Sequence, residues 1–218
     1  MLKKPYFWIA VWLVFLSLGP ITVLRDTPWQ AASNNRIIFS NFLQRIVGSV
    51  AFTMIFFQIV LGSLIPKLIE KLGPWVFKFH IIEGPIAYAL IVIHPLLFLT
   101  FKFFARGVFD PFYVFTAFCV LCSTRTEFFY TFGRMAFWLV SAAVLAAFLR
   151  TEPWWRDHWR KFHILNYFVF FLIAIHSYFI GTDSHFPPFV YFWWFAVIVV
   201  SGISIYKLWN LFRKPSGL

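Results

Sequence analysis

Four of the six histidines in this chain lie in two apolar runs and repeat with nearly the same spacing. His80 and His94 are fourteen positions apart in the first run, and His163 and His176 are thirteen apart in the second. An α-helix rises 1.5 Å per residue, so each pair would be separated by roughly 20 Å inside a hydrocarbon core about 30 Å thick. Each helix would therefore carry one imidazole toward either membrane face.

A polar side chain inside a bilayer needs a partner that offsets its desolvation, and haem iron is a common partner of neutral imidazole. If the two helices pack side by side, His80 pairs with His163 and His94 with His176, and the pairs hold two b-type haems. A lone histidine in an apolar helix is more often a packed residue that bonds a backbone carbonyl. The repeated spacing favours haem ligation and predicts an electron path across the membrane.

The register of the second helix needs a local distortion. At 100° per residue, fourteen steps return to about 40° from the starting face, whereas thirteen steps miss it by about 140°. Pro85 and Pro95 can kink the first helix only. The second helix must therefore bend, tilt or carry a π-bulge.

Composition places the chain in a membrane. Of its 218 residues 61% are hydrophobic and only 12% are charged, which excludes an ordinary soluble domain. The net charge of +11 lies in short segments beside apolar runs, so it predicts membrane orientation and not nucleic-acid binding. We expect an all-α, single-domain integral membrane protein, a bundle of six helices.

The apolar runs predict six spans, at residues 6–24, 41–65, 79–101, 131–149, 162–181 and 189–208. The first resembles a signal peptide in charge order, but it is long and lacks a small-x-small cleavage site, so we expect it to remain as a span. The second should end at Pro66. The aromatic stretch 112–121 is too short to cross and should lie in the outer interface.

The lysines and arginines favour an orientation in the plasma or bacterial inner membrane with both termini in the cytoplasm. Twelve of the nineteen would then face the cytoplasm: Lys3, Lys4, Lys67, Lys71, Lys78, Arg150, Arg156, Arg160, Lys161, Lys207, Arg213 and Lys214. In this orientation, His80 and His163 belong to the inner haem, and His94 and His176 to the outer one.

Six spans with His-x13-His on the third and His-x12-His on the fifth resemble the ferric reductase-like transmembrane domain family. That family includes NADPH oxidases, ferric reductases and the haem-binding subunit of the periplasmic methionine sulfoxide reductase system. The resemblance covers nearly the whole chain and implies an oxidoreductase membrane component with four histidine ligands. It also implies that Arg45 lies near the outer haem, where family members often carry an arginine.

The resemblance implies a cytoplasmic electron donor that depends on flavin or NAD(P)H, and an acceptor outside, namely ferric iron, oxygen or a partner reductase. This chain has no Gly-x-Gly-x-x-Gly after a strand. We therefore expect a separate flavoprotein, or FMN or FAD held on the cytoplasmic face. Phe98 stands where oxidases often have a further histidine, which speaks against dedicated superoxide production.

Several other residues allow two interpretations. Glu83 could bond the inner imidazole, carry a proton or simply contact a neighbouring helix, and Gly48, Gly62 and Gly84 suit either a flat macrocycle or close helix packing. Arg45 and Arg134 could pair with haem propionates or anchor the interface. The pair Cys119 and Cys122 could form a disulfide, relay electrons or stay unpaired.

Two other functions fit the same histidines. A dihaem cytochrome b that anchors a quinone-linked respiratory complex also uses two helices with paired histidines. A non-redox membrane transport subunit could use histidines to relay protons. Haem content and the response to quinols or flavins would separate these alternatives.

Overall fold

The computed structural model describes residues 5–213, with side chains up to residue 210, and all of its regular structure in that range is helical. Lys3, Lys4 and Lys214, which contributed to the predicted orientation, lie outside the described residues. The elements are α1 (Pro5–Asp26), α2 (Trp29–Ser33), α3 (Arg36–Leu72), α4 (Trp75–Arg106), α5 (Pro111–Thr116), α6 (Arg125–Phe148), α7 (Pro153–His163), α8 (Leu165–Ile180), the 3-10 turn η1 (Asp183–His185) and α9 (Phe189–Arg213).

Within the described residues, six helical segments are long and apolar enough to cross a membrane. Five of them are α1, α3, α4, α6 and α9, and the sixth combines α7 with α8 over Pro153–Ile180. This confirms the prediction of an all-α protein with six candidate spans. The aromatic segment between α4 and α6 contains only the short helix α5, which is too short to cross, as expected.

The helices extend beyond the apolar runs, and one predicted boundary is wrong. α3 does not end at Pro66 but continues to Leu72 with the proline inside it. A proline removes one backbone donor, whereas unwinding the chain near lipid would leave several polar groups without partners. Continuing the helix is therefore the less costly solution.

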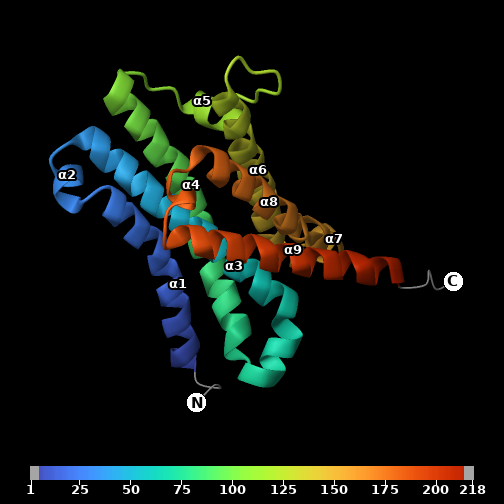
Figure 1. The fold of residues 1–218 in the computed structure, drawn as a ribbon. Helices are drawn as coiled ribbons and strands as arrows, with labels where there is room; N and C mark the ends of the chain where they lie inside the picture. Colours follow the sequence, from blue (N-terminus) through green and yellow to red (C-terminus); the bar gives the residue numbers. More distant parts are fainter. Residues whose placement is uncertain (1–4, 214–218) are drawn as a thin grey trace.

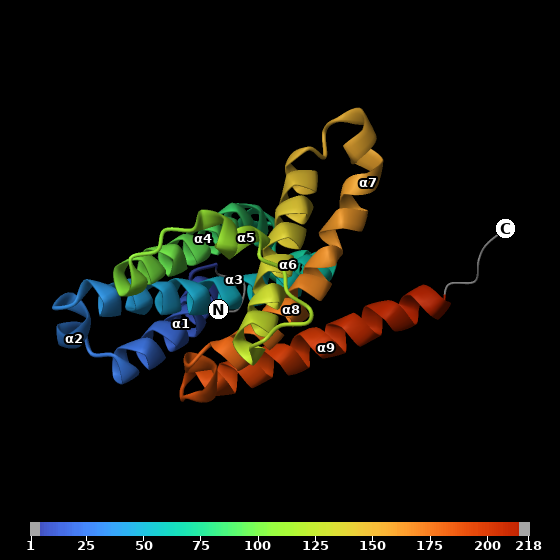
Figure 2. The same cartoon turned by 90° about the horizontal axis from the view of Figure 1, so that it is seen from above.

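The helices form two groups that meet along α3, α8 and α9. α3 and α4 make an antiparallel hairpin with α1 beside them, while α6 packs against α8 (Figure 1). The view from above shows α6 and α7 crossing the layer of α1, α3 and α4 at a large angle (Figure 2). The turn between α3 and α4 passes through Gly73 at φ 103°, a conformation that L side chains rarely adopt.

The largest apolar cluster joins these groups and consists mainly of aromatic rings. Phe52 and Phe56 of α3 pack against Phe170 of α8 and against Phe192 and Trp193 of α9. All five side chains are at most 5% exposed. This packing brings α8, which carries His176 and follows directly on His163, toward the α3–α4 hairpin.

Candidate functional site

The structure brings the predicted inner pair into contact. His80 lies near the start of α4 and His163 is the last residue of α7. Their ring centres are 6.3 Å apart and the ring planes are nearly perpendicular, at 85°. Two residues 83 positions apart in the sequence therefore present their imidazoles to each other across two helices.

The distance between these rings fits two nitrogen ligands on one metal ion. With a metal–imidazole bond of about 2.0 Å and about 1.1 Å from nitrogen to ring centre, opposed imidazoles have centres about 6.2 Å apart. The buried Nδ1 of His80 also has no hydrogen-bond partner among the described residues. The inner pair thus has the spacing and the donor chemistry for bis-histidine haem ligation.

The imidazoles of the outer pair are held by backbone carbonyls. His94 Nδ1 donates to the carbonyl oxygen of Gln44 at 3.0 Å, and His176 Nδ1 donates to that of Phe129 at 3.1 Å. A histidine that donates from Nδ1 to a carbonyl keeps its lone pair on Nε2, the arrangement usual for metal-bound histidines.

Three glycines lie against three of the four imidazoles. A Cβ on Gly48 would lie 2.8 Å from His94 Cε1, one on Gly62 3.2 Å from His80 Cε1, and one on Gly133 2.9 Å from His176 Nδ1. Gly84 contacts the amide of Gln58 instead. The missing side chains let the imidazoles lie directly on the backbone of α3 and α6.

A helix break after His163 supplies the distortion that the thirteen-residue spacing required. α7 ends at His163, Ile164 forms a turn, and α8 begins at Leu165. His163 can therefore face His80 of α4 while His176 faces Phe129 and Gly133 of α6. The fourteen-residue spacing on α4 needs no such break, and α4 runs uninterrupted through Pro85 and Pro95.

Arg45, the fifth predicted site residue, is bound to carboxylates. Its Nε and Nη2 donate to the two oxygens of Asp183 at 2.9 and 2.5 Å, and Nη2 lies 2.8 Å from Asp26. Nη1 donates to Thr27 Oγ1. Arg45 thus ties α3 to the end of α1 and to η1, and a contact with a haem propionate stays a prediction.

Glu83 is buried in a polar cluster between α1, α3 and α4. Its carboxylate accepts hydrogen bonds from Trp12 Nε1 at 3.1 Å and from Gln58 Nε2 at 2.6 Å, and it is 2% exposed. Gln58 also donates to the backbone carbonyl of His80 at 3.0 Å. Of the interpretations offered for Glu83, the contact to neighbouring helices is the one that the structure contains.

Arg134 of α6 is buried, and its guanidinium binds the α5 segment that follows the C-terminal end of α4. It donates to the carbonyls of Tyr113 and Ala117 at 3.1 and 2.5 Å and lies 3.5 Å from the carboxylate of Glu127. Burial raises the pKa of Tyr113 to about 12, and the hydrogen bond that its phenol donates to Glu127 adds to this. Arg134 therefore holds the α5 segment against α6, and its contact with a haem propionate or with the membrane interface stays a prediction.

The two cysteines and the remaining histidines are also placed. Cys119 and Cys122 form a disulfide between α5 and α6. His158 is half-buried and donates to the carbonyl of Trp154 in α7, and the exposed His185 donates to the carbonyl of Tyr178 in α8. His158 and His185 therefore do not belong to the two predicted histidine pairs.

Some site residues were not recognised from the sequence. No sequence motif marks Gly133, Gln58 or Asp183, because the residues that they contact are between 22 and 138 positions away. A signal did exist for Gly48 and Gly62: they are separated by fourteen residues, as His80 and His94 are, on the preceding antiparallel helix.

Among the described residues no three His, Cys, Asp or Glu side chains lie close enough to bind one metal ion together. A metal site here could therefore take at most two such ligands from the protein. Haem needs only two protein ligands, because the porphyrin supplies the other four. Comparison of the chain with protein families, with curated proteins and with solved structures gives no match.

Proposed function

We propose that the chain is a membrane electron-transfer protein that binds two b-type haems, one between His80 and His163 and one between His94 and His176. The 6.3 Å distance between the rings of His80 and His163 is the observation that carries this proposal. Six apolar helices, and outer imidazoles held by carbonyls, support it.

The direction of transfer follows from the proposed orientation. With both termini in the cytoplasm, His80 and His163 lie toward the cytoplasmic side, and electrons enter there from a flavoprotein, or from FMN or FAD bound at that face. They leave near His94 and His176 to an acceptor outside, such as ferric iron, oxygen or a partner reductase. The chain is then the membrane component of an oxidoreductase of the ferric reductase-like type.

The protein's own groups position and tune such a centre. The carbonyls of Gln44 and Phe129 fix the Nδ1 protons of His94 and His176, and Gly48 and Gly133 set how closely those rings approach the backbone. When bound, haem held by these imidazoles would supply an iron that takes up and releases one electron at a time. The apolar helices exclude water from the path.

The test is a reduced-minus-oxidised optical spectrum of the purified protein with a haem count per chain. We expect two b-type haems, falling to about one in His80→Ala or His163→Ala and likewise in His94→Ala or His176→Ala. The matched controls are His158→Ala and His185→Ala, which should keep both haems. A colourless protein, or retention of both haems in the four ligand variants, would contradict the proposal.

One observation favours a second candidate, a transport subunit that relays protons. Glu83 places a carboxylate at 2% exposure within a candidate span, one helical turn from His80. Buried carboxylates in membranes often belong to proton pathways. This candidate predicts a protein without haem whose proton flux in vesicles is lost in Glu83→Gln, so the same spectrum separates the two functions.

A further inference from the structure

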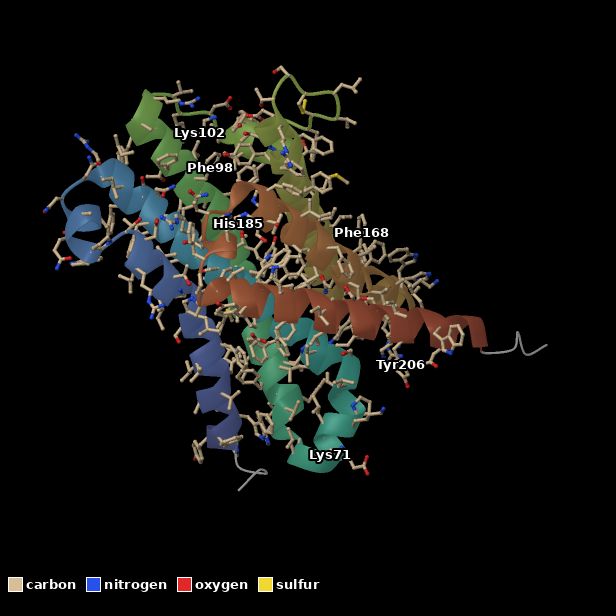
Figure 3. All side chains as sticks on the ribbon, viewed as in Figure 1. Lys71, Phe98, Lys102, Phe168, His185 and Tyr206 are labelled. Carbon is tan, nitrogen blue, oxygen red and sulfur yellow. A yellow bond between two sulfur atoms is a disulfide. The ribbon has the colours of Figure 1, made fainter. Side chains whose placement is uncertain are left out.

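A disulfide lies at the surface of the end proposed to face outward. Cys119 and Cys122 close a short loop between α5 and α6, at the same end of the molecule as Lys102 (Figure 3). Both cysteines are partly exposed, and the residues between them, Val120 and Leu121, are 76% and 98% exposed. The loop that holds the two sulfur atoms therefore lies at the surface of this end.

Direct contacts connect this loop to the outer histidine pair. The backbone N–H of Cys119 donates to Thr131 Oγ1 at 3.0 Å, and the Thr131 hydroxyl donates to the Cys119 carbonyl at 3.0 Å. The ring centre of Tyr130, the neighbour of Thr131, lies 6.2 Å from that of His176. Thr131 and its neighbour Tyr130 thus connect the disulfide loop to a candidate haem ligand.

The loop does not need the disulfide to hold its position. Arg134 binds the carbonyls of Tyr113 and Ala117, and Thr131 binds both backbone groups of Cys119. The cysteines are only three positions apart, and cross-links that close short loops remove little entropy from the unfolded chain. A small stabilising effect at an already anchored loop leaves room for a chemical role.

We propose that the Cys119–Cys122 disulfide is a redox centre that accepts the electrons arriving at the His94–His176 end of the bundle. This inference rests on the proposed function. Two electrons, delivered one at a time, break the S–S bond, and two protons from the outer solvent convert the sulfurs to thiols. The electrons come from a dihydroflavin on the cytoplasmic side, which loses two electrons and two protons there.

The product defines the substrate class. A Cys-x-x-Cys dithiol attacks a disulfide by thiol–disulfide exchange, transfers both electrons to it and closes again to its own disulfide. The acceptor at this site is therefore a disulfide outside the membrane. The two cysteines are partly exposed beside the exposed Val120 and Leu121, so such a substrate can approach the loop from outside.

The experiment uses the full chain in sealed vesicles that enclose FMN and EDTA. Illumination without oxygen reduces FMN only inside, so electrons reach the outer face only by crossing the protein. The charged aromatic disulfide 5,5′-dithiobis(2-nitrobenzoate) outside reports each dithiol that appears there as two released thionitrobenzoate ions, because the dithiol reduces the probe and closes again. We expect at least two ions per chain with its outer face exposed to the medium, rising with continued illumination, and none in the dark.

Two variants serve as matched controls. The double variant Cys119→Ser with Cys122→Ser should give no thiols while both haems are still reduced, and His176→Ala should give none because electrons no longer reach the outer end. Reduced haems without new thiols in the unmodified chain would overturn the redox role and leave the proposed function standing. Equal thiol counts in His176→Ala would also overturn it, and absence of haem bands would overturn the proposed function itself.

Discussion

Gly48 lies directly beneath the imidazole of His94, so close that a Cβ there would be 2.8 Å from the ring. Gly62 stands in the same relation to His80, at 3.2 Å. The two glycines on α3 are spaced like the two histidines on α4, so each imidazole of this hairpin rests on a glycine of its neighbour. This relationship fixes ring positions through backbone contact and not through a polar partner alone.

Replacing Gly48 by alanine should displace His94 and with it the outer haem. The added methyl group overlaps a ring that the surrounding helices confine, and overpacking of this kind costs about 1–3 kcal/mol. We expect Gly48→Ala to lower the haem count toward one per chain while the inner haem stays. Gly202→Ala, where a Cβ meets nothing within 4 Å, is the matched control and should keep both haems. Two haems in Gly48→Ala would show that the contact is not limiting.

The sequence predicted the six candidate spans and the contact between His80 and His163 from local patterns, whereas the pairing of His94 with His176 stays a prediction. Apolar runs set the number of spanning helices, and helical rise relates the spacing of the histidines to depth in the membrane. The helix end predicted at Pro66 is wrong because lipid penalises the unwinding that a proline often causes in water-soluble proteins. The amino-acid composition around Pro66 does not show that the helix continues.

The contacts that complete the site depend on tertiary structure. The turn at Ile164 has no proline or glycine to mark it, although the thirteen-residue spacing required a distortion somewhere in that segment. Asp183, the partner of Arg45, lies 138 positions further along the chain and could be assigned only once α9 and η1 were placed. The glycine pairing was readable in principle, since Gly48 and Gly62 repeat the spacing of the histidines.

Removing Arg45 should destabilise the end of the bundle where α1, α3 and η1 meet. Asp183 is 6% exposed and takes two hydrogen bonds from the guanidinium. Removing one partner of a buried ion pair costs about 3–5 kcal/mol, because it leaves the other charge uncompensated. We expect Arg45→Ala to lower the free energy of unfolding in detergent by about that amount, and Arg45→Lys by less. Arg25→Ala, at an exposed position, is the control, and equal losses in the two alanine variants would contradict the assignment.

Truncating Glu83 should destabilise the contact between α1, α3 and α4. Glu83→Ala leaves the donors of Trp12 and Gln58 without their acceptor, and a buried unsatisfied donor costs about 1–3 kcal/mol. Thermal unfolding in detergent should show a clear decrease in stability for Glu83→Ala. The exposed Glu70, near the end of α3, provides the matched variant Glu70→Ala, which should be nearly neutral. A neutral Glu83→Ala would mean that water or lipid replaces the carboxylate.

The phenol of Tyr113 should make stability depend on alkaline pH. Burial, together with the hydrogen bond to the Glu127 carboxylate, raises the pKa of Tyr113 to about 12, against about 10 for tyrosine in an unfolded chain. Because the pKa is raised on folding, the unfolded chain releases this proton first. The stabilisation is thus complete below about pH 10 and is lost as the pH rises toward about 12.

Unfolding in detergent, followed at several values between pH 9 and about pH 12, should show this loss in the unmodified chain and a shallower decline in Tyr113→Phe, which has no phenol to titrate. Glu127→Gln should shift the loss to lower pH, since the carboxylate no longer accepts the phenol proton, while burial keeps part of the effect. Identical profiles in the unmodified chain and Tyr113→Phe would show that the phenol does not titrate with folding.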